Sequence, residues 1–133
     1  MNPMSPNATP PTEPPQYYTR EEYHCCYRPM GSMSLAQAVD IVCAALRHAA
    51  LTSANRLLVD VTGLTGFETP TIVERQQLAR RLADAAQGKL RMVMLAKPEW
   101  IREDKFAIMV ARNHGLNSNV FDNEPEALAW LRR

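Results

Sequence analysis

The sequence lacks an excess of charge of either sign. It has 15 Lys and Arg residues against 14 Asp and Glu residues, which gives a formal net charge of +1. Proteins that bind nucleic acid or an anionic membrane surface usually carry a basic surplus, and none is present here. Nor does any apolar run approach the roughly 20 residues that span a bilayer. We therefore expect neither a nucleic-acid partner nor a membrane span.

Cysteine is scarce, with three residues at Cys25, Cys26 and Cys43. The first two are adjacent in a stretch predicted to be extended, so their side chains are expected on opposite faces of a sheet. This arrangement disfavours a shared metal or a disulfide, and an odd count without spaced pairs indicates reduced thiols. The N-terminus also lacks the charged and apolar regions of a signal peptide. These features predict a cytoplasmic protein.

The common catalytic and cofactor-binding motifs are missing as well. There is neither a Walker A pattern nor a G-x-G-x-x-G fingerprint, because the run Thr62-Gly-Leu-Thr-Gly66 lacks the lysine and the third glycine. There is no Gly-x-Ser-x-Gly elbow. The three histidines fall in three different predicted elements, and no pair of residues has the spacing of metal ligands. We expect no enzymatic activity, no cofactor and no metal.

Proline is concentrated at the N-terminus, where residues 1–16 hold six of the ten prolines and almost no large apolar side chain. Burial in such a segment cannot offset the entropy that is lost when the segment becomes ordered. Residues 1–16 are therefore predicted to be a disordered tail, and residues 17–133 a single domain.

Within the domain, predicted strands alternate with predicted helices. The strands are expected at residues 23–28, 57–61, 90–96 and 118–121, with a further short one beginning at 17–18. The helices are expected after the N-cap residues Ser34, Thr71 and Asn123, and over about 101–114. For the second helix, Thr69 followed by Pro70 is an alternative start. This alternation favours right-handed β-α-β crossovers. The predicted fold class is α/β, with a mostly parallel sheet of about four or five strands and helices packed on it.

Apolar side chains at helical spacing predict which face of each helix is buried. In the first helix they are Leu35, Val39, Val42, Leu46 and Ala49. In the second they are Ile72, Leu78, Leu82 and Ala86, and in the third Phe106, Met109 and Val110.

Three stretches of this domain resemble the STAS fold of bacterial anti-sigma-factor antagonists, and more closely its SpoIIAA-like branch. They are Gly31-Ser-Met-Ser-Leu-Ala-Gln-Ala38, Leu57-Leu-Val-Asp-Val-Thr-Gly63 and Lys105-Phe-Ala-Ile-Met-Val-Ala-Arg-Asn-His-Gly-Leu116, the last followed by Val120-Phe121 and Glu124-Pro-Glu-Ala-Leu-Ala-Trp-Leu131. Their order and spacing extend over residues 17–133. The resemblance implies a STAS-like domain in a bacterial regulatory protein, with a partner such as an anti-sigma-factor-like kinase.

In the regulatory proteins of that family, the loop after the central strand carries an aspartate, two serines and a glycine. Phosphorylation of one serine switches the binding of a partner kinase. The resemblance aligns Glu68, Thr69, Pro70 and Thr71 with these four positions. Because the proline has no hydroxyl, Thr69 and Thr71 are the candidate phosphosites that remain.

The segment Asp60–Thr71 is also the best candidate site on physical grounds. Ligands of open α/β sheets bind beyond the carboxyl ends of parallel strands, where helix N-termini present unpaired N–H groups. The alternative is that both threonines only cap the helix and that the aspartate caps the turn. A tryptophan after the next strand is predicted near the surface, as a contact anchor. The candidate residues are Asp60, Thr62, Gly63, Thr65, Gly66, Phe67, Glu68, Thr69, Thr71 and Trp100.

Two functional hypotheses follow. The first is a non-enzymatic protein-interaction module that contacts a regulatory protein through the loop and the start of the second helix. The second is a carrier or sensor of a small apolar, lipid-like or anionic ligand, held in a cavity lined by Met92, Met94, Met109 and Phe106, because methionine repacks easily. The alternative for these four is a plain core. We also consider a homodimer formed through an edge strand at residues 23–28.

Overall fold

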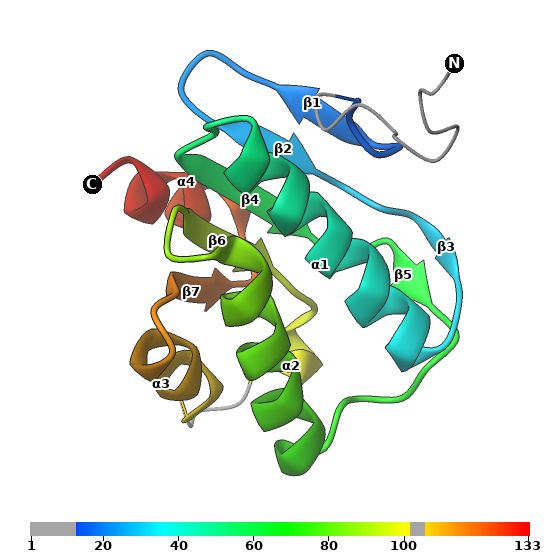
Figure 1. Ribbon diagram of the computed structural model, residues 1–133. Helices are drawn as coiled ribbons and strands as arrows, with labels where there is room; N and C mark the ends of the chain where they lie inside the picture. Colours follow the sequence, from blue (N-terminus) through cyan, green and yellow to red (C-terminus); the bar gives the residue numbers. More distant parts are fainter. Residues whose placement is uncertain (1–12, 102–105) are drawn as a thin grey trace, which may run out of the picture.

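The computed structural model describes residues 13–101 and 106–133, together with their side chains except that of Phe106. Its centre is a five-stranded sheet with the strand order β1-β2-β4-β6-β7 (Figure 1). The first strand is antiparallel to its neighbour, and the other neighbours run parallel. The strands are β1 (Tyr18–Arg20), β2 (Cys25–Tyr27), β4 (Arg56–Asp60), β6 (Arg91–Leu95) and β7 (Asn117–Phe121). The predicted α/β class with a mostly parallel sheet is confirmed.

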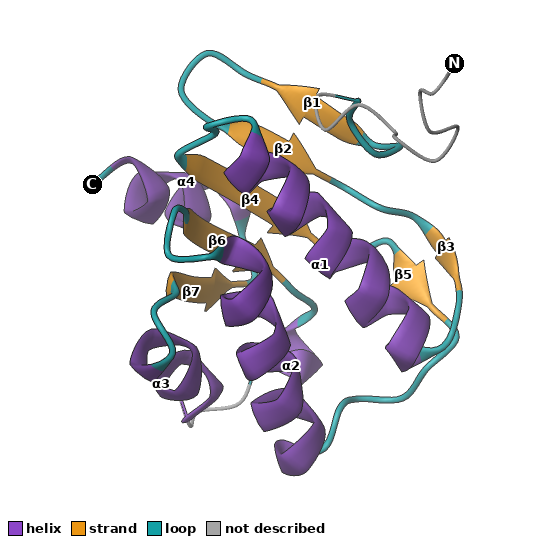
Figure 2. Ribbon diagram, viewed as in Figure 1, coloured by secondary structure: helices purple, strands orange, loops and turns teal. Residues whose placement is uncertain are grey.

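Helices cover both faces of this sheet (Figures 1 and 2). Three of them pack on one face, namely α1 (Leu35–Leu51), α2 (Ile72–Ala86) and α3 (Phe106–Asn113). The other face is covered by α4 (Glu124–Arg132). A 3-10 turn, η1 (Pro98–Trp100), follows β6. Two short parallel strands, β3 (Gly31–Ser32) and β5 (Leu64–Thr65), form a separate ribbon beside the N-terminal end of α1.

Side-chain caps at Ser34, Thr71 and Asn123 define where α1, α2 and α4 begin. The Ser34 hydroxyl accepts a hydrogen bond from the Gln37 N–H of α1 at 3.1 Å, and the Gln37 side chain accepts one from the Ser34 N–H at 2.9 Å. Thr71 and Glu74 make the same reciprocal pair at the start of α2. Asn123 caps α4. Each cap satisfies backbone donors that have no partner inside the helix.

The register of the parallel strands divides the buried side chains into two clusters, one on each face of the sheet. One row holds Cys25, Leu57 and Met92, and it packs under α1, α2 and α3. The next row contains Cys26 and Leu58, and it packs under α4. Successive side chains of a strand point to opposite faces. The predicted separation of the two adjacent cysteines is therefore confirmed.

Arginines at the amino ends of the central strands hold the last turn of α4. Arg56 Nε donates to the carbonyl oxygen of Leu131 at 2.9 Å, and Arg91 Nη2 donates to that of Trp130 at 2.7 Å. The Arg91 guanidinium also lies 3.9 Å from the centroid of the Trp130 ring. Terminal carbonyls of a helix lack intrahelical donors, so both arginines stabilise this end of α4.

Three expectations about strand edges and buried faces were wrong. The strand predicted at 23–28 is not an edge, because β1 pairs with it on its outer side and β4 on its inner side. Ile72 was expected to be buried, yet it lies in the first turn of α2, before the helix reaches the sheet, and is 57% exposed. Met109 faces away from the sheet and is also 57% exposed.

Some expectations fall on residues that the structure does not describe. The predicted tail, 1–16, lies mostly outside the described residues, and so does part of the helix predicted over 101–114, whose described portion is α3. Among the described residues, no helix combines the length and the apolar character needed to cross a membrane.

Candidate functional site

A pocket of about 170 Å³ lies between the sheet and the inner faces of α1, α2 and α3. We call it the α2 pocket. Its wall is almost wholly apolar and combines side chains from the three helices, from β6 and β7, and from the segments that flank the strands. They include Val42, Val61, Leu82, Met92, Met94 and Leu116.

Two aromatic rings form part of the rim of the α2 pocket. Phe67, in the loop after β5, and Trp100, at the end of η1, stack with their ring centroids 5.3 Å apart and their planes 25° apart. The Lys97 ammonium lies 4.8 Å from the centroid of the Trp100 ring and donates to the carbonyl oxygen of Leu64 at 3.3 Å. These contacts join the loop after the central strand to the segment after β6.

One charged side chain lines the α2 pocket among the described residues, that of Arg75. It lies on the same face of α2 as Leu78 and Leu82, which also line the pocket. Its Nη2 atom is buried, and no described residue accepts a hydrogen bond from it. Ser118 also lines the pocket and is the one polar residue that is buried among those described.

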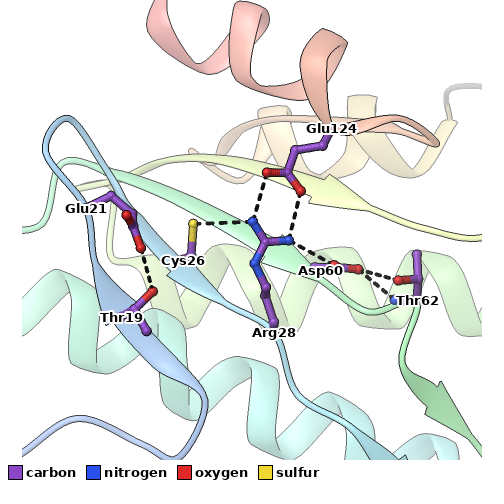
Figure 3. Close-up of polar contacts among 7 residues, drawn as sticks. All are labelled: Thr19, Glu21, Cys26, Arg28, Asp60, Thr62 and Glu124. Atoms are coloured by element: carbon purple, nitrogen blue, oxygen red, sulfur yellow. Dashed lines mark hydrogen bonds and ion pairs between the residues drawn. The ribbon is translucent and has the colours of Figure 1, made fainter.

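A second polar cluster lies on the α4 side of the sheet, centred on Arg28 (Figure 3). Its two terminal nitrogens donate to the two carboxylate oxygens of Glu124, at 2.9 and 3.0 Å. One of them also donates to Asp60 Oδ2 at 3.0 Å. The hydrogen bonds to Glu124 raise the pKa of Arg28 above its ordinary value. This forked pairing ties β2, β4 and the start of α4 together.

Asp60 belongs to this cluster and has all its described contacts there. Its Oδ1 accepts hydrogen bonds from the Thr62 N–H at 3.0 Å and from the Thr62 hydroxyl at 2.6 Å. Figure 3 shows the carboxylate between Arg28 and Thr62. The aspartate thus caps the turn after β4, which is the alternative that the sequence left open. It is not part of the α2 pocket, because it lies on the opposite face of the sheet.

The glycines and Thr65 of the predicted site hold the β3–β5 ribbon. A Cβ atom on Gly66 would lie 2.6 Å from the carbonyl oxygen of Met33, and its φ of +102° disfavours any other residue. A Cβ on Gly63 would meet the carbonyl oxygen of Pro29 at 3.1 Å. Thr65 pairs with Ser32 in the ribbon. These residues shape the loop through their backbone.

The remaining predicted residues divide between the rim, the helix cap and the surface. Phe67 and Trp100 line the pocket, Thr71 caps α2, and Glu68 is exposed. Thr69 is partly exposed. The structure therefore does not bring the ten candidate residues into one site.

Of the side chains predicted to line a cavity, Met92 and Met94 do so. Met109 is exposed, and the side chain of Phe106 lies outside the described part. Arg75 is not among the site residues predicted from the sequence. The spacing of Arg75 could have indicated its position, because it lies three residues before Leu78 in a helical stripe that is otherwise apolar.

Residues 13–101 and 106–133 contain neither a cluster of metal ligands nor a reactive thiol. No group of three or more His, Cys, Asp or Glu side chains there could hold a metal ion. The three cysteines are buried and form no disulfide, and burial raises the pKa of the Cys26 and Cys43 thiols. Thiols of this kind are poor nucleophiles.

The chain was compared with protein-family models, with curated proteins and with solved structures, and nothing in any of the three matches it. The resemblance to STAS domains therefore stays a prediction. The geometry of the α2 pocket and of the loop beside it is the basis for a functional proposal.

Proposed function

We propose that this protein binds a small apolar or amphipathic molecule in the α2 pocket, as a carrier or sensor and not as an enzyme. The observation that carries the proposal is the pocket itself, with its volume of about 170 Å³ and its apolar wall. Protein interiors are close-packed and contain few voids larger than a water molecule. An engineered apolar cavity of about 150 Å³ binds benzene, so this pocket has room for a ligand of roughly six to ten non-hydrogen atoms.

The composition of the wall fits this use. Ligand pockets are mostly apolar and hold a few polar groups that fix the orientation of the ligand. Here Arg75 and Ser118 are such groups in an apolar surround. The stacked pair of Phe67 and Trp100 adds an aromatic rim. The sequence alone favours the interaction module, whereas the pocket favours ligand binding.

The experiment is a titration of the full chain with straight-chain carboxylates from butanoate to decanoate, followed by NMR. We expect affinity to rise about fourfold for each added methylene until the pocket is full, and then to level off. The variant Ala79→Leu places a larger side chain in the wall and should weaken binding, whereas Ala44→Leu, on the exposed face of α1, should not. If neither the carboxylates nor the uncharged amide of the six-carbon chain shifts any resonance, the α2 pocket is not a ligand site.

A second candidate function is the STAS-like interaction module, a bacterial cytoplasmic regulator that binds a signalling protein. The observation that favours it is the start of α2, where the adjacent Ile72 and Val73 are 57% and 60% exposed. Large apolar side chains that lie together on the surface are typical of protein contact sites. They directly follow the loop that the family resemblance points to. Thr69 is the better candidate phosphosite, because the Thr71 hydroxyl is engaged as the helix cap.

The interaction module is tested by chemical cross-linking in cells with a variant that carries Ile72→Ser and Val73→Ser. The matched control is Leu51→Ser, since Leu51 is 57% exposed at the far end of α1. We expect a partner cross-linked by the wild-type chain to be lost with the double variant and kept with the control. A partner kept by both variants would remove the start of α2 from the interface.

A further inference from the structure

The charged residue in the α2 pocket indicates what kind of ligand the pocket takes. Arg75 differs from two other arginines of this chain whose guanidinium groups meet carboxylates. Arg28 is paired with Glu124 and Asp60, and Arg81 with Asp40. In contrast, the buried Nη2 of Arg75 has no acceptor among the described residues.

A buried guanidinium nitrogen without an acceptor is unfavourable, because it has lost its hydrogen bonds to water and gained none. The nearest acidic residue along the helix is Glu74, and its carboxylate accepts a hydrogen bond from the Thr71 N–H in the helix cap. Among the described residues that line the pocket, no acidic side chain balances the charge of Arg75. The pocket therefore favours a ligand with a negatively charged acceptor.

The shape of the pocket adds a second requirement. Arg75, Leu78 and Leu82 follow one another along the inner face of α2. The rise of an α-helix places the first and the last of them about 10 Å apart. Pro70, just before the cap of the helix, also lines the pocket, whereas Leu82 lies toward the other end of the helix. A ligand in this space has its polar end at Arg75 and its apolar end toward Leu82.

We propose that the ligand is a small amphipathic carboxylate, with its head bound by the Arg75 guanidinium and its apolar chain packed along α2. The planar guanidinium matches the two oxygens of a carboxylate, and such charge-assisted hydrogen bonds are stronger than those to a neutral acceptor. This inference rests on the proposed function, because it assigns the ligand class of the same pocket.

The test compares hexanoate with hexanamide, which have the same number of non-hydrogen atoms and differ in charge. Dissociation constants are measured by NMR titration at neutral pH. We expect the wild-type chain to bind hexanoate at least about tenfold more tightly than hexanamide. Arg75→Gln should remove this preference and leave hexanamide affinity within about twofold of the wild-type value. The control Arg80→Gln, at an exposed position of α2, should keep the preference.

The possible failures are distinguishable. If the wild-type chain binds hexanoate and hexanamide equally, or if Arg75→Gln keeps the preference, the pocket binds ligands but the assignment of a carboxylate head to Arg75 is wrong. If the wild-type chain binds neither probe, the proposed function fails and this inference fails with it. The comparison of the two probes on the wild-type chain needs no variant, so it decides the question even if Arg75→Gln does not fold.

Discussion

Filling the α2 pocket with a larger side chain should not destabilise the protein, whereas the same substitution elsewhere in the helix should. Ala79 and Ala86 are both buried residues of α2, with exposed fractions of 4% and 0%. The first lines the pocket and the second does not. Replacing each by leucine therefore changes the same helix by the same chemistry. Alanine and leucine are both strong helix formers, so helix propensity contributes little to either variant.

The expected magnitudes follow from the space around each position. Each added methylene that becomes buried contributes about 0.8 kcal/mol, so Ala79→Leu has about 2 kcal/mol to gain from filling the pocket. Strain from imperfect fit reduces this gain, and we expect a free energy of unfolding between the wild-type value and about 2 kcal/mol above it. At Ala86 there is no pocket to fill, so Ala86→Leu should lower the free energy of unfolding by about 1–3 kcal/mol through overpacking.

Equilibrium unfolding in urea, followed by circular dichroism, measures both variants against the wild-type chain. The midpoint of Ala79→Leu should equal or exceed that of the wild type, and the midpoint of Ala86→Leu should be lower, with unchanged denaturant dependence. Equal destabilisation of the two variants would refute the reasoning, since it would mean that the space beneath α2 is packed like the rest of the core.

Three further outcomes test other parts of the structure. Gly66→Ala should lower the free energy of unfolding by more than about 2 kcal/mol, because the added Cβ clashes with the backbone. Gly88→Ala has open space around its Cβ and should lower it by about 1 kcal/mol, so equal losses in urea unfolding would contradict this reasoning. Arg28→Met should lower the free energy of unfolding by about 1–2 kcal/mol, because its ion pairs with Asp60 and Glu124 are partly exposed. An unchanged midpoint of urea unfolding would show that these ion pairs contribute nothing to stability. Burial lowers the pKa of His24, so the unfolded chain takes up a proton first and stability should fall as the pH drops below about 6.5. Unfolding measured between pH 8 and 5 should show a shallower fall for His24→Gln than for the exposed-site control His114→Gln, and identical pH profiles would exclude this role of His24.

Much of the fold could be predicted from the sequence because its signals are local. Capping boxes at Ser34 and Thr71 mark helix starts through the hydrogen bonds of a few neighbouring residues. The apolar run at residues 57–61 is too short for a helix and favours a strand buried on both faces. The expectation that residues 23–28 form an edge failed because strand order in a sheet depends on which strands pair. Local patterns indicate that a segment is extended but do not show that β1 pairs with β2 on the side away from β4.

The candidate site was predicted less well, and the reason is geometrical. Sequence order places Asp60 and Phe67 in one loop, but the strand before the loop has side chains on both faces of the sheet. The Asp60 side chain lies on the face of the sheet that packs under α4, whereas Phe67 packs against the core under α1, α2 and α3. The pocket also depends on Ser118, which is distant in sequence and reaches the same space only through the pairing of β6 with β7.

The two proposed functions are linked through α2. Its inner face, with Arg75, lines the pocket, while Ile72 and Val73 in its first turn are exposed. Pro70 lines the pocket as well and immediately precedes the cap of the helix. A ligand that contacts Pro70 and Arg75 therefore contacts both sides of the turn that presents the exposed residues. If ligand binding changes the preferred position of this turn, partner binding must change ligand affinity by the same factor, because coupling between two binding sites is reciprocal.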